Sequence, residues 1–328
     1  MGFDIETVGR ASVTRRVAVK SAGAASLAAL IARGSLLSAS AQDATPATSG
    51  DYPTIAFTAK DYEFVGLPAS VEGGYTRLSM TQEGPSDHHA IFMKLNDGVT
   101  ADDFLASIER GDFGQILGSG ISLGGPNAGA AGSTINVIVD LTPGQYAVVC
   151  LIPDEESGML HAAMGMFSPL EVTEASAASK PEYQAEIDLI DFRFDGLTSE
   201  IPAGSHVWAV KDTGEQPHEM VVYKQAPGVP YSMIESIFLS SPEATPEASP
   251  VGAESNPDDV ASPEASAEES GPPPFTAIGG VAPLYPGVTN YLELMLDAGD
   301  YFAICFVPDA ATGAPHFALG MLMPFTVA

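Results

Sequence analysis

Basic residues are scarce in this chain of 328 residues. It has 13 lysines and arginines against 42 aspartates and glutamates, and its formal net charge is −29. A chain with this balance is repelled by phosphate backbones, so the composition argues against nucleic acid as a partner. The same charge can steer a basic partner protein toward the molecule, or it can serve solubility alone.

Cysteine is rarer still, and long apolar runs are missing. The chain has two cysteines, Cys150 and Cys305, so no lipid-attachment pattern exists near its start. Residues 22–37 form the longest apolar stretch near the N-terminus, and it is too short and too interrupted to predict a stable membrane span in the mature chain. No catalytic triad, paired-carboxylate or phosphate-loop pattern stands out.

The first 41 residues have the order of an export signal. Residues 14–20, Thr-Arg-Arg-Val-Ala-Val-Lys, resemble the twin-arginine motif, and the apolar stretch follows them. Ala39, Ser40 and Ala41 then form a small-residue cleavage pattern. We therefore expect twin-arginine export across the cytoplasmic membrane, to the periplasm, the cell surface or beyond. An ordinary amphipathic N-terminal helix is the alternative, and cleavage of the signal is left open.

A motif of three metal-binding residue types occurs twice. Both copies read Cys-x10-His-x4-Met, and both cysteines stand in the setting Tyr-x3-Cys-x2-Pro-Asp. The residues are Cys150, His161 and Met166 in the first copy, and Cys305, His316 and Met321 in the second. Thiolate, imidazole and thioether form a soft ligand set that suits copper.

The upstream halves of the two copies also match. A shift of 130 residues places 61–67 on 191–197 and His88 on His218, without gaps. The chain is therefore an internal duplication, with about 25 additional residues in the second copy. Each copy has one early histidine followed by a late cysteine, histidine and methionine.

The duplication predicts two domains behind a leader. The predicted segments are an export signal (1–41), a linker (42–50), domain 1 (51–174), a linker (175–180) and domain 2 (181–328). Residues 240–274 are rich in Pro, Glu, Ala and Ser and cannot bury enough surface to fold, which predicts a disordered insertion in domain 2.

Within each copy the pattern predicts mostly short strands. Residues 135–141 alternate, 142–145 form a turn and 146–152 are apolar, so we expect Cys150 to point inward near the end of a strand. One short helix per copy is expected, at 101–109 and 232–238. The expected fold class is all-β, with two tandem β-sandwiches.

The order of one early histidine and three clustered C-terminal ligands resembles the cupredoxin (blue copper) family. This resemblance implies Greek-key sandwiches and one or two type 1 copper ions. The implied metal ligands are His88, Cys150, His161 and Met166, and His218, Cys305, His316 and Met321. Met164 is a rival axial ligand in the first copy. The family's Asn after the first histidine, which ties the ligand loops together, is replaced here by His89 and Glu219.

The resemblance implies an exported carrier of single electrons, and an enzyme is less favoured. Copper enzymes of the nitrite reductase and multicopper oxidase type need further histidines, and four of the six present are already assigned. A metal-free binding module, or one that stores or delivers copper, remains an alternative. Methionines that only fill the core and a disulfide between Cys150 and Cys305 remain alternatives too.

Overall fold

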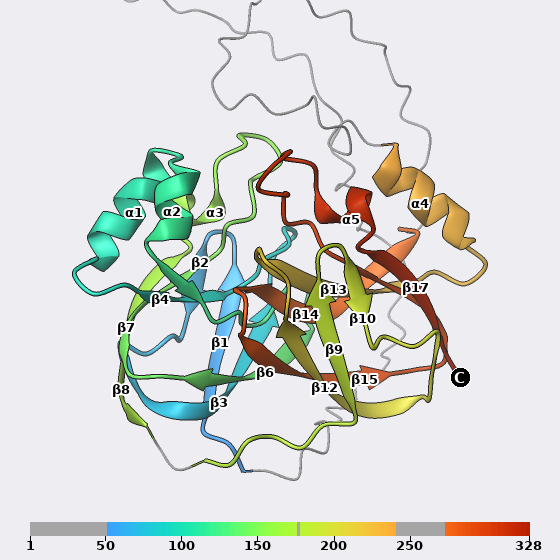
Figure 1. Cartoon of the computed structure of the whole chain (residues 1–328), viewed down its shortest axis with the longest axis horizontal. Coiled ribbons are helices and arrows are strands. Elements are labelled where there is room, and N and C mark those ends of the chain that lie inside the picture. The colour runs from blue at the N-terminus through green and yellow to red at the C-terminus, as the bar shows by residue number, and fades with distance from the viewer. Residues whose placement is uncertain (1–50, 176–177, 241–272) are drawn as a thin grey trace, which may run out of the picture.

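The computed structural model describes residues 51–175, 178–240 and 273–328. The predicted export signal, the linker 42–50 and residues 241–272 of the predicted insertion lie outside the described residues. In the described part, strands fold into two sandwiches that follow one another along the chain (Figure 1). The predicted all-β fold class with two tandem β-sandwiches is therefore confirmed. The first sandwich is called unit 1 and the second unit 2.

Unit 1 has two sheets joined by one long strand. Its strands are β1 (Thr54–Lys60), β2 (Glu63–Val65), β3 (Ser70–Gln82), β4 (Ile91–Leu95), β5 (Gly120–Ser122), β6 (Thr134–Leu141), β7 (Gly144–Val149) and β8 (Phe167–Ala175). The start of β3 pairs in parallel with β8, whereas its later part lies between β1 and β6. Strands β8, β7, β4 and β5 continue the second sheet. These crossovers are those of a Greek-key sandwich.

Unit 2 repeats this plan with one interruption. Its strands are β9 (Ala185–Ile190), β10 (Arg193–Asp195), β11 (Glu200–Ile201), β12 (Gly204–Asp212), β13 (His218–Gln225), β14 (Phe275–Leu284), β15 (Thr289–Leu296), β16 (Gly299–Ile304) and β17 (Leu322–Val327). The counterpart of β3 is divided into β11 and β12, and Pro202 stands between them where unit 1 has Glu72. A proline cannot donate to the ladder, which explains the break.

The two units share a sheet. Strand β6 of unit 1 pairs with β15 of unit 2 in antiparallel register, and Val137 lies opposite Leu292. Like Cys150 and Cys305, these two residues are 155 positions apart and are counterparts in the repeat, so a pseudo-twofold axis passes between them. Across the same interface, the Nε and Nη2 atoms of Arg77 donate to the carboxylate of Glu293 at 3.0 Å each.

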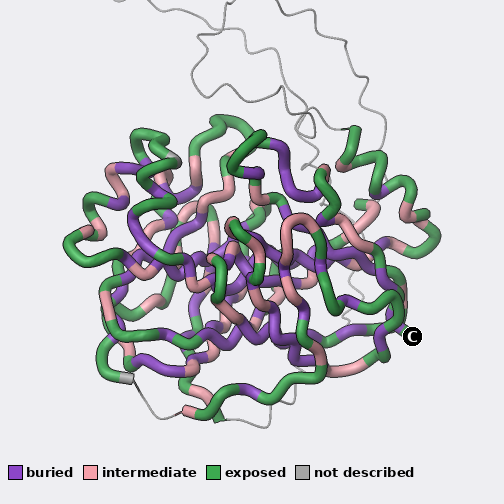
Figure 2. The backbone as a smooth tube through the Cα atoms, in the orientation of Figure 1, coloured by how far each residue is buried: buried purple, intermediate pink, exposed green. Residues whose placement is uncertain are grey.

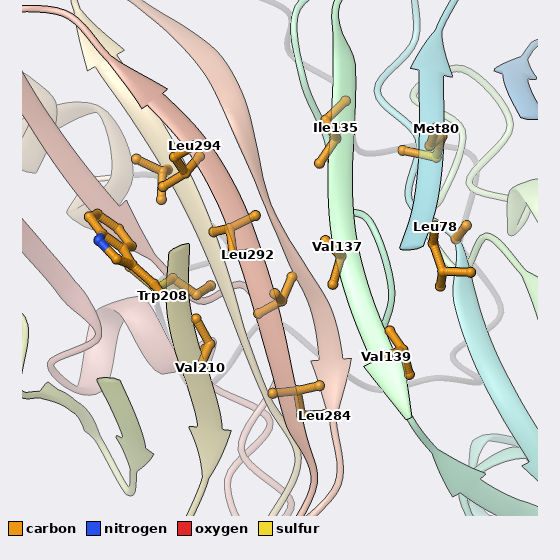
Figure 3. Close-up of a cluster of buried hydrophobic side chains, with 14 of the residues drawn as sticks. Leu78, Met80, Ile135, Val137, Val139, Trp208, Val210, Leu284, Leu292 and Leu294 are labelled. Carbon is orange, nitrogen blue, oxygen red and sulfur yellow. The ribbon is translucent and has the colours of Figure 1, made fainter. Parts of the chain in front are cut away.

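One face of this joined sheet forms the main core. Leu78, Val137, Leu292 and Trp208 lie directly opposite one another on four adjacent strands, and all are at most 1% exposed. Figure 3 shows this row with its neighbours from both units. Because cross-strand contacts of this kind are the unit of sheet stability, the core holds the two units together as well as each one separately.

Short helices cover the outer faces of the second sheets. They are α1 (Ala101–Glu109), α2 (Phe113–Gly118), α3 (His161–Met164), α4 (Tyr231–Leu239) and α5 (His316–Leu319). In unit 1, α1 buries Phe104 and Ile108 against β4 and β7. In unit 2, α4 buries Ile234 against β13 and β16. Their outer surfaces are exposed (Figure 2). In the described part of the chain, no helix is long and apolar enough to span a membrane.

The helix predictions were partly wrong. The expected helices at 101–109 and 232–238 exist as α1 and α4, and the Thr100 side chain caps α1 by accepting from the Asp103 N–H. The expectation of one helix per copy missed α2, α3 and α5. The strand expected at 146–152 ends at Val149, so Cys150 stands just beyond β7.

Candidate metal centres

Three buried donor side chains converge in unit 1. The Nδ1 atom of His88 lies 3.1 Å from Nδ1 of His161, and the Sγ atom of Cys150 lies 3.5 Å from that same nitrogen. All three donor atoms lie within 4.8 Å of one another, and no side chain of the three is more than 2% exposed. Metal bonds to imidazole and thiolate are about 2.0 to 2.3 Å long. Donor atoms about 3 to 4 Å apart therefore fit one shared ion, and we call this cluster site 1.

Unit 2 repeats the cluster closely. The Nδ1 atoms of His218 and His316 are 2.9 Å apart, and Sγ of Cys305 lies 3.5 Å from Nδ1 of His316. All three residues are fully buried. We call this cluster site 2. The predicted His and Cys residues of each copy are thus brought together by the fold.

Main-chain hydrogen bonds fix the loop that carries the last three predicted ligands. Cys150 follows β7 and its N–H donates to the Met166 carbonyl at 3.2 Å. His161 begins α3, and its carbonyl accepts from the Met166 N–H at 2.9 Å. The equivalent bonds in unit 2, Cys305 to Met321 and Met321 to His316, are 3.1 and 2.9 Å long. The donors are therefore held in place by backbone geometry.

The ten residues between Cys and His fold back on themselves. The Asp154 N–H donates to the Met159 carbonyl, and the Asp154 carboxylate accepts from the N–H and hydroxyl of Ser157. Gly158 has a φ of 68°, which suits glycine, and closes the turn. The His161 N–H then donates to the Ile152 carbonyl at 2.9 Å. The long gap forms a small hairpin and leaves His161 beside Cys150.

The two predicted axial methionines occupy equivalent buried positions. Met166 precedes β8 and Met321 precedes β17, and neither is exposed. Met164, the rival in the first copy, corresponds to Leu319, which is 39% exposed. This correspondence favours Met166 as the counterpart of Met321, and its role as an axial ligand stays a prediction.

The residues after the first histidines do tie the ligand segments together. The Nε2 atom of His89 accepts from the Leu151 N–H at 2.8 Å. In unit 2, Oε1 of Glu219 accepts from the Phe306 N–H at 3.0 Å. Both bonds join the first-histidine segment to the residue that follows the cysteine. Two different side chains therefore make the tie that the family makes with Asn.

Glu219 has a further partner in the other unit. Its Oε2 atom accepts from the Nδ2 atom of Asn127 at 2.7 Å, and its N–H donates to Sγ of Cys305 at 3.4 Å. Burial raises the pKa of Glu219 to about 7. Site 2 is thus supported by a residue of unit 1.

An aromatic ring covers the second histidine of each site. Tyr62 lies 4.7 Å from the His161 ring, measured between centroids, and its hydroxyl donates to Asp154 at 2.5 Å. Phe192 lies 4.9 Å from the His316 ring and has no hydroxyl. These rings help to shield the donor clusters from water.

In unit 2 an amide takes over the contact that Tyr62 makes in unit 1. The Oε1 atom of Gln216 is 3.2 Å from Nε2 of His316, and its Nε2 atom donates to the Asp309 carboxylate at 3.0 Å. Gln216 therefore binds both the second histidine and the hairpin that precedes it.

An aspartate stands behind the first histidine of each site. The Nε2 atom of His88 is 2.6 Å from Oδ1 of Asp61, and that of His218 is 2.6 Å from Oδ1 of Asp191. Sequence reasoning did not single out these aspartates. The signal was present, because Asp61 and Asp191 correspond under the shift of 130.

Burial sets the protonation of the donors. It lowers the pKa of His161 and of His316 to about 4, and it also lowers the pKa of His88 and of His218. It raises the pKa of the Cys150 thiol to about 12. At neutral pH the imidazoles are therefore neutral and able to bind a metal, whereas a thiol would release its proton on binding. Both cysteines are free and buried, so the disulfide alternative is not what the structure has.

The sequence matches no protein-family model and no curated protein. Among solved structures, a reduced auracyanin from Roseiflexus castenholzii is 21% identical, with 44% of this chain and 94% of that chain covered and a TM-score of 0.25. A multicopper oxidase is 14% identical (84% and 88% covered, TM-score 0.23). A copper nitrite reductase from Nitrosomonas europaea is 11% identical (85% and 94% covered, TM-score 0.23). With TM-scores below 0.5, these similarities carry no argument, and the function has to be inferred from this chain's own residues.

Proposed function

We propose that this protein is an exported copper protein that carries single electrons through two type 1 centres. The observation that carries the proposal is the pair of buried His–Cys–His clusters. Two imidazoles and one thiolate favour copper, whereas calcium and magnesium prefer oxygen ligands. The proposed ligands are His88, Cys150, His161 and Met166 in site 1, and His218, Cys305, His316 and Met321 in site 2. Bound copper would supply the Cu(I)/Cu(II) couple.

The protein's own part is to hold the donors and to exclude water. The ligand loop of each site is fixed by main-chain hydrogen bonds, and its donors are buried. The N–H of Glu219 donates to the Cys305 sulfur, a contact of the kind that tunes the potential of such centres. A preorganised, dry donor set supports electron transfer with little movement of the protein.

The remaining histidines favour a carrier over a copper enzyme. His89 accepts from the Leu151 N–H, and Nε2 of His206 is 2.7 Å from the Pro202 carbonyl. Both rings are thus engaged with the main chain. No histidine of this chain is left to build a second, catalytic copper cluster within one molecule.

Export, the domain boundaries and the partner belong to the same proposal. The twin-arginine pattern at 14–20 supports export, and replacement of Arg15 and Arg16 by lysine is expected to block it.

We place the boundary between the domains at residues 175–180. The net charge of −29 supports a basic redox partner, whose association rate should fall as salt is added.

Copper loading of purified protein tests the function. We expect an intense visible thiolate-to-copper band in the wild type, about half of it in Cys150→Ser and in Cys305→Ser, and none in the double variant. The loaded protein should take up and release one electron per copper reversibly. A wild type that binds copper without this band, or binds none, would instead be a storage or metal-free module.

A further inference from the structure

We propose that Asp61 and Asp191 are positioning residues for the two metal sites. Each carboxylate holds the ring of its site's first histidine so that Nδ1, and not Nε2, offers its lone pair to the metal. The proposal deepens the proposed function of sites 1 and 2 and rests on it.

The geometry is the same in both units. The Nε2 atoms of His88 and His218 each lie 2.6 Å from an aspartate Oδ1 atom, on the side of the ring away from the donor cluster. The Nδ1 atoms of the same rings lie 3.1 and 2.9 Å from the second histidine of each site. Two copies of the sequence that differ at many positions have therefore kept one arrangement.

The chemistry of the pair decides the tautomer. A neutral imidazole has one N–H and one lone pair, and an ionised carboxylate can only accept a hydrogen bond. The proton therefore sits on Nε2 beside the aspartate, and the lone pair sits on Nδ1. Outer carboxylates of this kind orient a ligand histidine and raise its basicity, and their loss typically weakens metal binding 10- to 100-fold.

Each aspartate is itself held in place. The Ser86 hydroxyl donates to Oδ2 of Asp61 at 3.1 Å. The Glu215 N–H donates to Oδ1 and Oδ2 of Asp191 at 3.2 and 3.3 Å. The aspartate side chains are 24% exposed and the imidazoles are fully buried, so each hydrogen-bonded pair connects the buried site with a partly solvent-exposed carboxylate.

A glycine makes room for each pair. A Cβ atom on Gly214 would lie 2.3 Å from Oδ1 of Asp191 and 2.6 Å from Nε2 of His218, closer than such atoms can approach. A Cβ atom on the corresponding Gly84 would lie 3.1 Å from Oδ1 of Asp61. Only a residue without a side chain fits at position 214 while the carboxylate and the imidazole stay together.

The first experiment needs no copper. Nitrogen chemical shifts of the histidine rings in the metal-free full-length protein should show the proton of His88 and of His218 on Nε2. We expect Asp61→Ala to give a mixture of tautomers at His88 and to leave His218 unchanged, with the reverse for Asp191→Ala. His88 in the same tautomer in Asp61→Ala as in the wild type would overturn the proposal. Because no metal is involved, this result stands even if the sites prove not to bind copper.

The second experiment measures copper directly. In a Cys305→Ser background, where site 1 alone keeps its thiolate, Asp61→Ala should weaken Cu(II) binding 10- to 100-fold. Asp61→Asn keeps an acceptor without the charge, so it should keep the tautomer and raise the reduction potential. A tenfold larger loss for Cu(II) than for Cu(I) corresponds to about 59 mV. Glu63→Ala, which removes a nearby surface charge paired with Lys60, is the matched control and should change neither value.

The glycine gives an independent variant for site 2. Gly214→Ala, in a Cys150→Ser background, should lower copper affinity by a factor similar to that of Asp191→Ala. Gly118→Ala is the control, because nothing lies within 4 Å of a Cβ atom added there. Copper affinities within twofold of the background for both Gly214→Ala and Asp191→Ala would contradict the positioning role.

Discussion

The two metal sites have nearly identical donors and different surroundings. The distance between the Nδ1 atoms is 3.1 Å in site 1 and 2.9 Å in site 2, and the sulfur-to-nitrogen distance is 3.5 Å in both. Around these donors, the tie to the cysteine segment is made by His89 in one unit and by Glu219 in the other. The donor geometry therefore tolerates little change, whereas the supporting contacts can be made by other side chains.

The interface between the units adds a polar contact beside site 2 but not beside site 1. Asn127 of unit 1 donates to Glu219 beside site 2, whereas its counterpart across the pseudo-twofold axis is Ala282, which packs with the apolar residues of unit 1. The carboxylate of Glu219 in unit 2 is therefore paired with an amide, whereas the position related to Asn127 by the axis offers unit 1 only a methyl group. Site 2 depends on a polar contact from the neighbouring unit that site 1 does not have.

The largest effect on the free energy of unfolding is expected at a buried position where unit 1 has Gln82 and unit 2 has Asp212. Burial, aided by the charge of Asp191, raises the pKa of Asp212 from 3.8 to about 7. The unfolded chain loses this proton from about pH 4 upward, whereas the folded chain keeps it until about pH 7. The stabilisation from this group is therefore complete below pH 4 and is lost as the pH rises to 7.

Asp212→Asn should remove this dependence. We expect the free energy of unfolding of the variant, relative to the wild type, to rise between pH 4 and pH 8 by up to about 4 kcal/mol. Urea unfolding of the metal-free protein at several pH values measures it, with Gln82→Asn as the control in unit 1. A difference that stays constant with pH would show that Asp212 is not protonated in the folded protein.

A smaller effect is expected when the contact between the units is cut. Asn127→Ala removes the donor to Glu219 and leaves a buried carboxylate oxygen without that partner, which should destabilise the protein by about 2 to 3 kcal/mol. It should also change the copper spectrum of site 2 and not that of site 1. Tyr285→Phe, which removes another hydrogen bond between the units, to the Leu117 carbonyl, is the control and should leave both spectra unchanged.

Two substitutions give site 1 the surroundings of site 2. His89→Glu places a carboxylate where no amide from unit 2 can pair with it, so we expect a loss of about 1 to 3 kcal/mol at pH 8. Adding Ala282→Asn should recover part of that loss. A double-mutant cycle measures the coupling, and additive effects would mean that positions 89 and 282 do not interact.

The smallest effect is expected at the aromatic covers. Tyr62→Phe loses the hydrogen bond to Asp154 and should lower stability by about 0.5 to 1.5 kcal/mol. The reverse change, Phe192→Tyr, should gain nothing, because Gln216 already binds the Asp309 carboxylate. Thermal unfolding of the two metal-free variants compares them. A gain in Phe192→Tyr equal to the loss in Tyr62→Phe would refute this account.

The donor residues were predictable because the same motif occurs in both copies of the internal repeat. A single histidine such as His88 would not by itself predict a metal ligand. Because His218 lies at the corresponding position of the second copy, 130 residues later, a chance occurrence is much less plausible. The helix α1 was equally predictable, since Thr100 and Asp103 cap it locally. The donor residues were thus predicted from the repetition of the sequence, and α1 from a cap within a few neighbouring residues.

Other features depend on contacts between distant parts of the chain. The helices α3 and α5 span four residues each, too few to show a helical period. Strands β6 and β15 pair with each other, but their sequence patterns fit strands of two separate sandwiches equally well, so the pairing could not be predicted. Asp61 matched Asp191 in the repeat, but only the fold places each one behind a histidine. The Asn127 contact has no counterpart in the repeat and could not be found from it.

The pseudo-twofold axis between Val137 and Leu292 has a consequence for assembly. In a symmetric dimer of identical subunits, a residue on the axis faces its own copy. Here two corresponding residues face each other in the same way, within a single polypeptide. The molecule thus has the architecture of a homodimer whose subunits have been joined end to end. The joining has allowed corresponding residues to become different: Arg77 and Glu293 pair across the interface, whereas their counterparts are Val207 and Ile138.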